Sequence, residues 1–460
     1  MGLTAEEPGR RAGALERRFD SLRRSLRSPG VSAAVRTTDG SCWEHATGLA
    51  DVEGEIPMTV TTPLRIGSVT KTFTAAAVAL LAERGALELD DPAVAHLPQL
   101  RALPVNGHRL EALTIRRLLE HRSGLVGEPP TRDWSKAPFP STQEILQRID
   151  LARVAIAPGS AFKYSNLGYA LLGAIVARAS GVAYEDFVQQ ALLDPAGLTS
   201  TGWDPPAGAA LGYGCGPPGS WARQLPMELG GERPGGGMWS TLTDLLRWAQ
   251  VAMGEAPTVL SPSTAALLAS PQGSEDDASP AQRSLGWQLS WQGERLVHGH
   301  GGGVTGYTCH LAFEIAACTA AVVLTNGHAQ PQPACLSLLD LAAAGDADQN
   351  ADSTTEALPS DDVACGLMEW PAATPASPEA AGDYVGPTDA VLRIERGEQR
   401  ELRLTGELLQ EDGAALLRPQ SRDRFLVDGD RFAGETLELA RDGCGSVVAL
   451  SVAGFRFLRG

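Results

Sequence analysis

Lysine is almost absent from this chain. Its 460 residues include three lysines, Lys71, Lys136 and Lys163, so arginine supplies most of the positive charge. The 55 acidic side chains outnumber the 38 basic ones and give a formal net charge of −17. Because proteins bind nucleic acids largely through cationic side chains, this balance argues against a nucleic-acid partner.

Long apolar runs are also missing. No stretch of 18 apolar residues occurs, so the sequence predicts no membrane-spanning helix. The first 28 residues are charged throughout and lack the apolar segment of a signal peptide, from which we expect a cytoplasmic protein. The seven cysteines are scattered and lack C-x-x-C spacing, which predicts reduced thiols, no zinc site and no metal or other cofactor.

The apolar pattern divides the chain into two folded units. Early and late strand-like segments enclose a series of helices, which predicts an α+β domain, residues 1–345, with an antiparallel sheet flanked by helices. Residues 346–382 carry eight acidic and no basic side chains, which predicts a linker. Short alternating segments in residues 383–460 predict a small antiparallel β-barrel or sandwich.

Periodicity and turn signals also predict the individual elements of the larger domain. The expected strands are 31–36, 41–47, 285–289, 295–298, 305–313 and 319–324. The expected helices are 8–28, 70–84, 114–121, 142–150, 166–179, 184–192 and 242–253.

The strongest chemical motif lies at the start of the helix predicted for residues 70–84. Ser68 would occupy its first turn and Lys71 would follow three residues later, so both side chains would lie on one face. The positive end of the helix dipole and a desolvated amine would together make this serine nucleophilic. The alternative is an ordinary serine and a solvent-exposed lysine at a helix start.

The Ser-x-x-Lys pattern occurs a second time, at Ser160 and Lys163. The Pro158-Gly159 turn signal precedes it and no amphipathic helix follows, so these two side chains need not share a face. Helix context therefore favours Ser68 and Lys71 as the functional pair.

Two further residues could complete the chemistry of a Ser–Lys pair. Tyr164 would shuttle a proton if Lys71 lowered the pKa of its phenol, and Asn166 would hold a substrate carbonyl. The alternatives are a half-buried aromatic residue and the N-cap of the following helix.

A glycine-rich segment, His298-Gly-His300-Gly-Gly-Gly303, lies between two predicted strands. Its glycines would allow close approach of a ligand, and one of its N–H groups would form an oxyanion hole with that of Ser68. Either histidine is also consistent with an ordinary strand side chain, and no third metal ligand lies nearby.

Three of these motifs, in this order, resemble the signature elements of the class C β-lactamase and penicillin-binding-protein superfamily. They are Ser68-Val-Thr-Lys71, Tyr164-Ser-Asn166 and His300-Gly301-Gly302, within a resemblance that spans about residues 30–330. The resemblance implies an acyl-enzyme mechanism with Ser68 as nucleophile, Lys71 and Tyr164 as proton carriers, and Asn166 as a substrate ligand. It also implies an oxyanion hole formed by the N–H groups of Ser68 and Gly303.

The third motif departs from the pattern of β-lactamases. Those enzymes carry Lys-Thr-Gly where this chain has His300-Gly301-Gly302, so a fixed positive charge and a hydroxyl that grip a β-lactam carboxylate are missing. Efficient β-lactam hydrolysis is therefore not expected. Either Tyr164 or His300 would help to protonate the leaving group. The replacement of lysine by histidine is common among esterases, D-peptide hydrolases and acyltransferases of the superfamily.

A narrower resemblance is to the penicillin-binding-protein-type thioesterases, which are stand-alone cyclases of nonribosomal peptide synthesis with a lipocalin-like β-domain. It implies a peptidyl thioester or ester substrate with a D-configured C-terminal residue, presented by a carrier protein and released as a macrocycle. Trp239 and Arg456 would line the pocket; the alternatives are a buried aromatic and a surface charge. An esterase, a D-aminopeptidase, a DD-peptidase and a catalytically inactive binding module remain open as alternatives.

Overall fold

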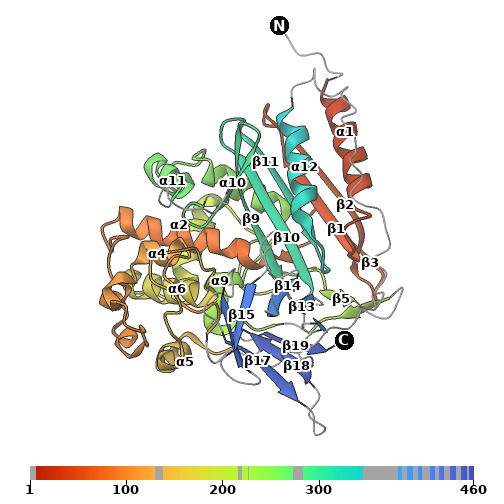
Figure 1. Cartoon of the computed structure of the whole chain (residues 1–460). Coiled ribbons are helices and arrows are strands. Elements are labelled where there is room, and N and C mark those ends of the chain that lie inside the picture. The colour runs from red at the N-terminus through yellow and green to blue at the C-terminus, as the bar shows by residue number, and fades with distance from the viewer. Residues whose placement is uncertain are drawn as a thin grey trace.

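The computed structural model of the chain describes residues 7–129, 138–215, 220–225, 227–272 and 283–344, together with the strands between residues 382 and 459. In the larger domain, seven of the described strands form an antiparallel sheet with helices on both faces (Figure 1). Their order is β3 (Ile56–Pro57), β2 (Cys42–Asp51), β1 (Gly30–Arg36), β11 (Thr319–Thr325), β10 (Tyr307–Glu314), β9 (Arg295–Val304) and β8 (Gln288–Gln292).

The early strand β1 closes this sheet by pairing with the late strand β11, as the sequence predicts. Successive side chains of β1 point to opposite faces of the sheet. Ala34 therefore enters the core beneath the central helices, whereas Val31, Ala33 and Val35 enter a second core on the other face.

The second core is covered by α1 (Glu7–Leu22) and α12 (Pro331–Ala343), which lie side by side in Figure 1. Leu15 and Phe19 of α1 are buried against the sheet, so the predicted amphipathic helix is confirmed. It ends at Leu22 rather than at residue 28, although Leu26 in the following turns still packs into the same core.

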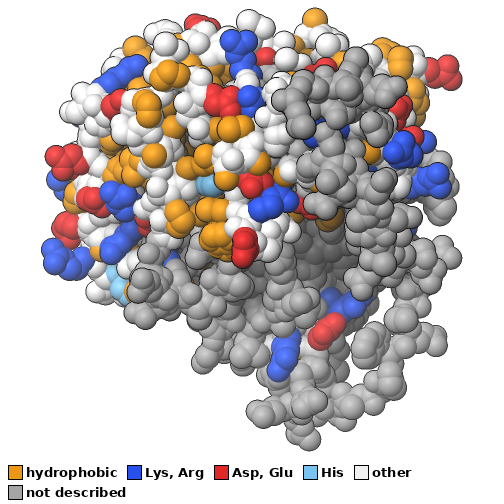
Figure 2. Space-filling view, turned by 90° about the horizontal axis from the view of Figure 1, so that it is seen from above, with side chains coloured by type: hydrophobic (Ala, Val, Ile, Leu, Met, Phe, Trp, Pro, Cys, Tyr) orange, Lys and Arg blue, Asp and Glu red, His pale blue; other side chains and the backbone are white. Residues whose placement is uncertain are grey.

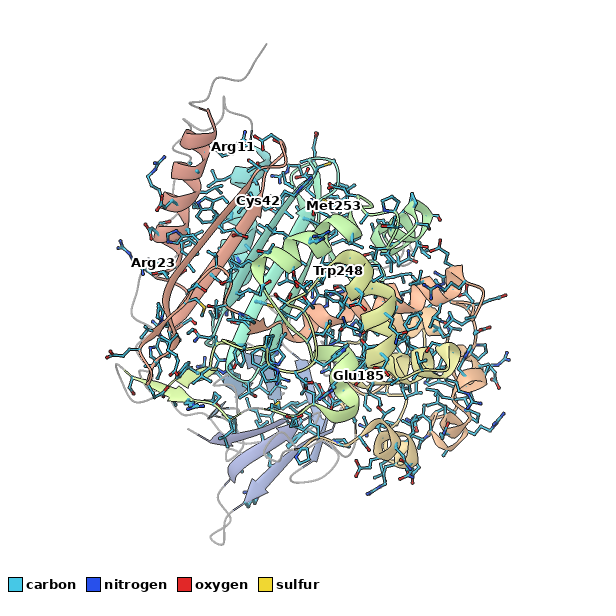
Figure 3. All side chains as sticks on the ribbon, turned by 180° about the vertical axis from the view of Figure 1, so that it is seen from behind. Arg11, Arg23, Cys42, Glu185, Trp248 and Met253 are labelled. Carbon is cyan, nitrogen blue, oxygen red and sulfur yellow. The ribbon has the colours of Figure 1, made fainter. Side chains whose placement is uncertain are left out.

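The opposite face carries the central helix α2 (Thr70–Glu83), close to the predicted bounds, with α6 (Asn166–Ser180) and α10 (Leu242–Ala252) around it. Most of α2 is buried; Phe73 stacks on Trp248 with ring centroids 3.9 Å apart. The indole N–H of Trp248, labelled in Figure 3, donates to Thr72 Oγ1 at 2.8 Å. These contacts fix the orientation of the helix that carries Lys71.

Shorter elements complete this layer. The helices are α3 (Ala93–His96), α4 (Ile115–Leu119), α5 (Thr142–Gln147), α7 (Tyr184–Val188) followed by a π-helical turn (Gln189–Leu193), α8 (Asp194–Ala196), α9 (Arg233–Gly236) and α11 (Pro262–Ala269). The strands are β4 (Leu64–Arg65), which pairs with β7 (Trp239–Ser240), and β5 (Tyr213–Cys215), which pairs with β6 (Trp221–Arg223).

Two strand predictions differ from the structure. The strand expected at 285–289 begins only at Gln288, because Gly286 has φ +86 and residues 284–287 form a turn closed by the Ser284 N–H and the Trp287 carbonyl. The strand expected at 295–298 continues as β9 to Val304, since its glycines pair with β10 instead of ending the strand.

The eight strands described in the C-terminal part close into an antiparallel barrel, in which β12 pairs with β19. They are β12 (Gly382–Val385), β13 (Val391–Arg396), β14 (Leu402–Gly406), β15 (Ala415–Pro419), β16 (Arg424–Asp428), β17 (Thr436–Arg441), β18 (Val447–Val452) and β19 (Phe455–Arg459). The sequence predicted either a barrel or a sandwich for this part, and the pairing of its first and last strands shows a barrel. The likeness to lipocalins and the domain boundaries stay predictions, and the predicted linker 346–382 lies outside the described residues except for Gly382.

On the face shown in Figure 2, acidic and basic side chains of the described residues are interspersed. No single helix among the described residues is long and apolar enough to cross a membrane; a bent pair, Asn166–Ser180 with Tyr184–Ala196, meets the criteria of length and composition.

Candidate active site

Ser68 lies in a 3₁₀ turn, Gly67–Val69, that leads directly into α2. The sequence predicted the first turn of the helix, and the structure places the serine just before it. Gly67 has φ +45, and a Cβ at this position would lie 2.6 Å from the Gly303 nitrogen. The turn therefore requires glycine, because both its left-handed backbone and the close approach of β9 exclude a larger side chain.

Lys71 is buried beside Ser68 and contacts three acceptors. Its Nζ donates to Ser68 Oγ at 3.3 Å, to Asn166 Oδ1 at 2.7 Å and to the Gly235 carbonyl at 2.6 Å. Hydrogen bonds to oxygen acceptors of this kind favour the charged form of an amine.

Tyr164 reaches Ser68 from the other side. Its hydroxyl donates to Ser68 Oγ at 3.0 Å, and its ring lies 4.8 Å from Lys71 Nζ. The His121 ring stacks on the phenol with centroids 4.2 Å apart, and the Ser165 N–H donates to His121 Nδ1 at 3.0 Å. The structure thus brings the predicted serine, lysine and tyrosine into one hydrogen-bonded group.

Asn166 is the first residue of α6, and its side chain turns toward the serine–lysine pair. The N-cap alternative for this residue is wrong: Ser165 caps the helix by accepting a hydrogen bond from the Gly168 N–H at 2.9 Å. Asn166 Oδ1 accepts from Lys71, and Asn166 Nδ2 donates to Glu128 Oε1 at 2.7 Å. The sequence analysis missed the buried Glu128, because no motif or spacing pointed to a residue 38 positions before its partner.

His300 lies on β9, where its ring is buried and Nδ1 is 2.6 Å from the Gly301 carbonyl oxygen. Burial, followed by the positive charge of Lys71, lowers the pKa of His300 to about 3. The imidazole is therefore neutral at physiological pH and cannot replace the positive charge of a lysine. No contact of its ring with Ser68 appears among the described interactions, so its part in proton transfer stays a prediction.

The glycines of β9 bring the strand against the serine turn. A Cβ on Gly302 would overlap the Ile66 carbonyl oxygen and lie 2.7 Å from Cys309 Sγ, so this position requires glycine. Gly301 has more room, because a Cβ there would lie 3.4 Å from His310 Nδ1, and a Cβ on Gly303 would meet open space. The backbone of Gly303 thus lies next to the Ser68 turn, where the predicted oxyanion hole requires it.

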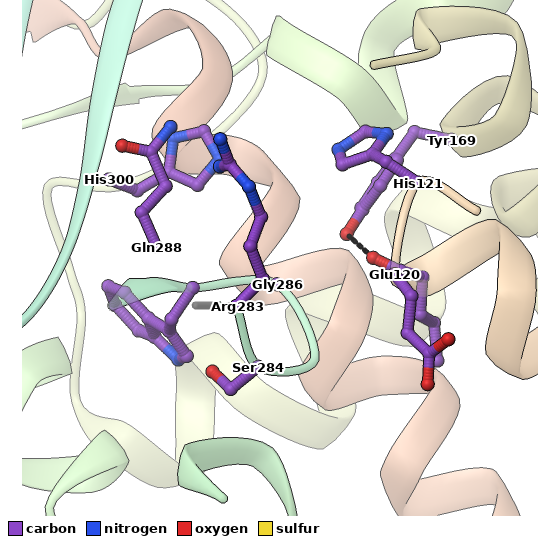
Figure 4. Close-up of a pocket in the computed structure, with 10 residues that line it drawn as sticks. Glu120, His121, Tyr169, Arg283, Ser284, Gly286, Gln288 and His300 are labelled. Atoms are coloured by element: carbon purple, nitrogen blue, oxygen red, sulfur yellow. Dashed lines mark hydrogen bonds between the residues drawn. The ribbon is translucent and has the colours of Figure 1, made fainter. Parts of the chain in front are cut away.

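Figure 4 shows a small pocket whose lining includes His121 and His300. It is lined by Leu119, Glu120, His121, Tyr169, Arg283, Ser284, Gly286, Trp287, Gln288 and His300. The Arg283 guanidinium lies 4.0 Å from the Phe162 ring centroid, and burial lowers its pKa to about 10. The sequence analysis did not identify Arg283, because in sequence it follows no recognisable motif.

The remaining predicted residues are less directly connected to the serine. Trp239 is 8% exposed and packs against Tyr307 and the Arg65 guanidinium, each 5.5 Å away, which fits the alternative of a buried aromatic. Arg456 belongs to β19 and pairs with Ser451, but its side chain lies outside the described residues. Their roles as pocket residues stay predictions.

The second Ser-x-x-Lys sequence does not form a second pair of this kind. Ser160 is exposed and donates to the Ala157 carbonyl at 2.6 Å, whereas Lys163 is completely buried. Among the described residues, no group of three or more His, Cys, Asp or Glu side chains could hold a metal ion.

Comparison with known proteins identifies the class to which this site belongs. Residues 15–344 match the family model described as Beta-lactamase, and the chain therefore belongs to that family. The resemblance predicted from the three motifs is confirmed at this level, and a serine-hydrolase function of the family is supported. Residues 375–459 match a model described as a domain of unknown function, DUF7586.

Individual relatives cover parts of the chain. Beta-lactamase-like protein 2 of Dictyostelium discoideum is 28% identical over 257 residues, which are 53% of this chain and 46% of that protein. Esterase EstB of Burkholderia gladioli is 34% identical over 203 residues, 42% of this chain and 51% of that protein. The chain thus spans about half the length of these curated relatives.

Solved structures extend the similarity over nearly the whole chain. A crystal structure of SurE is 25% identical, covers 99% of this chain and 100% of that chain, and has a TM-score of 0.63. A crystal structure of SurE with D-Leu, also 25% identical, covers 98% of this chain and 100% of that chain with a TM-score of 0.58. The similarity therefore extends over the residues of both the larger domain and the C-terminal barrel.

Proposed function

We propose that this protein is a penicillin-binding-protein-type thioesterase: a serine acyltransferase that accepts a peptidyl thioester or ester and releases a macrocyclic peptide. The observation that carries the proposal is the hydrogen-bonded arrangement in which Ser68 Oγ contacts both Tyr164 and Lys71. This arrangement supports an acyl-enzyme mechanism without a histidine base.

We infer that Tyr164 is the group that takes the proton from Ser68. Lys71 lies among three oxygen acceptors, and hydrogen bonds from an ammonium group to such acceptors favour its charged form. A charged Lys71 next to the phenol ring would stabilise the phenolate. Asn166, held by Glu128, would keep the ammonium in place and offer its remaining amide hydrogen to the substrate.

The reaction then proceeds in two steps. In the reactive form Tyr164 is a phenolate, which accepts the Ser68 proton while Oγ attacks the thioester carbonyl. The oxyanion is held by the N–H groups of Ser68 and Gly303. Collapse of the tetrahedral intermediate expels the thiolate, which takes the proton from Tyr164 and leaves an ester on Ser68. The amine of the same peptide attacks this ester, gives up a proton to Tyr164 and closes the ring, and Oγ recovers that proton.

Two observations support a D-configured peptide over a β-lactam as the substrate. SurE, whose structure is similar along nearly the whole chain, has been crystallised with D-Leu. In this chain the buried His300 is neutral, so β9 lacks the fixed positive charge at that position that would hold a β-lactam carboxylate. A carrier protein as the donor of the peptide, and a cytoplasmic site of action, are parts of the same proposal.

The second candidate is hydrolysis, by an esterase, D-aminopeptidase or DD-peptidase of the same family. The similarity to Esterase EstB favours it, because the same acyl-enzyme gives a linear acid when water attacks in place of the amine. The two functions share Ser68 and differ only in the nucleophile of the second step.

The test uses two peptidyl thioester mimics that differ only in a D- or L-residue at the C-terminus, with products separated by mass spectrometry. We expect the D-ended mimic to give a cyclic product and the L-ended mimic to give little. Ser68→Ala should abolish turnover, whereas the matched control Ser160→Ala should retain it, because Ser160 is exposed and contacts its own turn. Linear acid alone from both mimics would refute the cyclase and support the hydrolase; rapid turnover of nitrocefin would support a β-lactamase.

A further inference from the structure

A partly buried cation lies close to the proposed catalytic group and has no counter-ion among the described residues. Arg283 precedes β8, where its backbone bridges to Gln272 and Gln288. Its guanidinium packs over the ring of Phe162, two residues before Tyr164 in the sequence, and no described acidic side chain forms an ion pair with it. Burial of an unpaired charge is unfavourable, so such a residue is a candidate for a functional role.

The carboxylate in the same pocket does not neutralise this charge. Glu120 lines the pocket, but Figure 4 shows its carboxylate pointing away from the guanidinium of Arg283. The positive charges that act on Glu120 come from Arg116, Arg122 and Arg117. Burial lowers the pKa of Arg283 to about 10, and the guanidinium therefore remains positively charged at physiological pH.

Four ionisable groups surround Tyr164 and Arg283, from four parts of the fold. Lys71 on α2 is a cation, and His121, after α4, stacks on Tyr164 and accepts a hydrogen bond from the Ser165 N–H. Tyr169 on α6 donates to the Leu119 carbonyl at 3.1 Å, and burial raises the pKa of its phenol strongly. His300 on β9 is neutral because its pKa falls to about 3. Because burial keeps Tyr169 protonated, Tyr164 is the phenol near Arg283 whose anion the guanidinium can stabilise.

We propose that Arg283 is a positioning residue whose guanidinium supplies the fixed positive charge of the site and stabilises the phenolate of Tyr164 during acylation of Ser68. The geometry that supports this role is the shared neighbour His121, which lines the pocket together with Arg283 and stacks on the Tyr164 ring with centroids 4.2 Å apart. The inference rests on the proposed function, since it assumes that Tyr164 accepts the serine proton. It also explains how β9 can carry a neutral His300 while the site keeps a second cation besides Lys71.

The experiment measures how fast an uncharged fluorophosphonate labels Ser68 between pH 6 and pH 10, followed by intact-protein mass. Ser68 Oγ attacks the phosphorus and fluoride leaves, so the rate reports the activation of Ser68 that acylation also requires. Because this probe contains no anion, binding of a substrate carboxylate to Arg283 cannot affect the result. We expect Arg283→Gln to shift the rising limb of the pH–rate profile upward by about one pH unit and to slow acylation about ten-fold at pH 7. Arg283→Lys should restore most of the rate, because it keeps the charge.

Two controls separate charge from packing. Arg247→Gln removes an exposed arginine of α10 and should leave the profile unchanged. A double-mutant cycle with Tyr164→Phe should show that Arg283→Gln slows acylation in the wild-type background and has no further effect when the phenol is absent. Circular dichroism melting curves check that every variant in the cycle is folded. If Arg283→Gln does not fold, Arg283→Met takes its place as the uncharged variant and is compared with Arg283→Lys in the same cycle.

Three outcomes would overturn the inference: an unshifted pH profile for Arg283→Gln, equal losses in the Lys and Gln variants, or the same loss in the Tyr164→Phe background. The same experiment distinguishes failure of this inference from failure of the proposed function. If the wild-type protein does not label at Ser68 at all, the acyl-enzyme mechanism itself is wrong. If it labels normally but the profile does not move, the role of Arg283 alone is refuted.

Discussion

The contact between β9 and the serine turn can be tested with one added methyl group. In Gly302→Ala, the new Cβ would overlap the Ile66 carbonyl oxygen and lie 2.7 Å from Cys309 Sγ. A backbone oxygen cannot rotate away as a flexible side chain can, so β9 or the chain before Ser68 must move. Overpacking of this kind costs about 1–3 kcal/mol in the free energy of unfolding.

The same movement should weaken catalysis, because Gly303, the next residue, contacts the Gly67 position from which the serine turn begins. Removal of one oxyanion donor from another serine enzyme lowers kcat by roughly 10²–10³-fold. We therefore expect Gly302→Ala to acylate at least ten-fold more slowly than the wild type, because displacement of the donor is milder than its removal. The melting temperature should fall by about 2–12 °C if each kcal/mol lowers it by about 2–4 °C.

Gly303→Ala is the matched control, since a Cβ at this neighbouring position meets no atom within 4 Å. It should keep the wild-type melting temperature, and a small fluorophosphonate should still label Ser68. The test compares the melting temperatures and the Ser68 labelling rates of both variants with those of the wild type. If Gly302→Ala melts and labels like the wild type, the close contact between β9 and the Ser68 turn has no functional importance, and the predicted oxyanion hole loses its structural basis.

Two further predictions concern groups around the serine. Glu128→Ala should slow Ser68 labelling about ten-fold, because the Asn166 amide loses the acceptor that orients it. Glu128→Gln keeps an acceptor and should slow labelling less. Equal labelling rates for the wild type and both variants would contradict this prediction. The ring signals of His300 in an NMR titration should not shift between pH 5 and pH 8, because its pKa is lowered to about 3; a transition near the ordinary value of 6.5 would contradict its burial. Since the folded protein binds this proton less readily than the unfolded chain, the contribution of His300 to stability is present above pH 6.5 and declines as the pH falls toward 3.

Local sequence signals predicted the elements that are continuous in the chain. The helix of Lys71 was predictable because apolar spacing and the stop signal at Gly85, which has φ +69, agree with each other. The length of β9 was not predictable from its glycines, and the reason is physical. Glycine usually weakens a strand, but here the missing side chains are what allow β9 to pass against the Ser68 turn.

Residues of the candidate site were predictable when they belong to a short sequence motif, and not when only tertiary contacts place them there. The motifs predicted Ser68, Lys71 and Tyr164, and the structure brings these three side chains within hydrogen-bonding distance. Glu128 and Arg283 have no such motif, because each acquires its place only when distant segments pack together. Ionic groups of this kind are recognised by burial and partners, neither of which a single sequence displays.

The two Ser-x-x-Lys sequences differ in the surroundings of their serines. Lys71 and Lys163 are equally buried, so desolvation of the amine does not distinguish them. Ser160 donates back to its own turn, whereas Ser68 receives hydrogen bonds from an amine on α2 and from a phenol in the segment before α6. A buried lysine can thus serve structure alone, and it becomes part of an acyl-transfer site when the fold brings a partly exposed hydroxyl and a second proton carrier to the same point. The convergence on Ser68 Oγ, rather than the four-residue pattern, is what supports acyl transfer here.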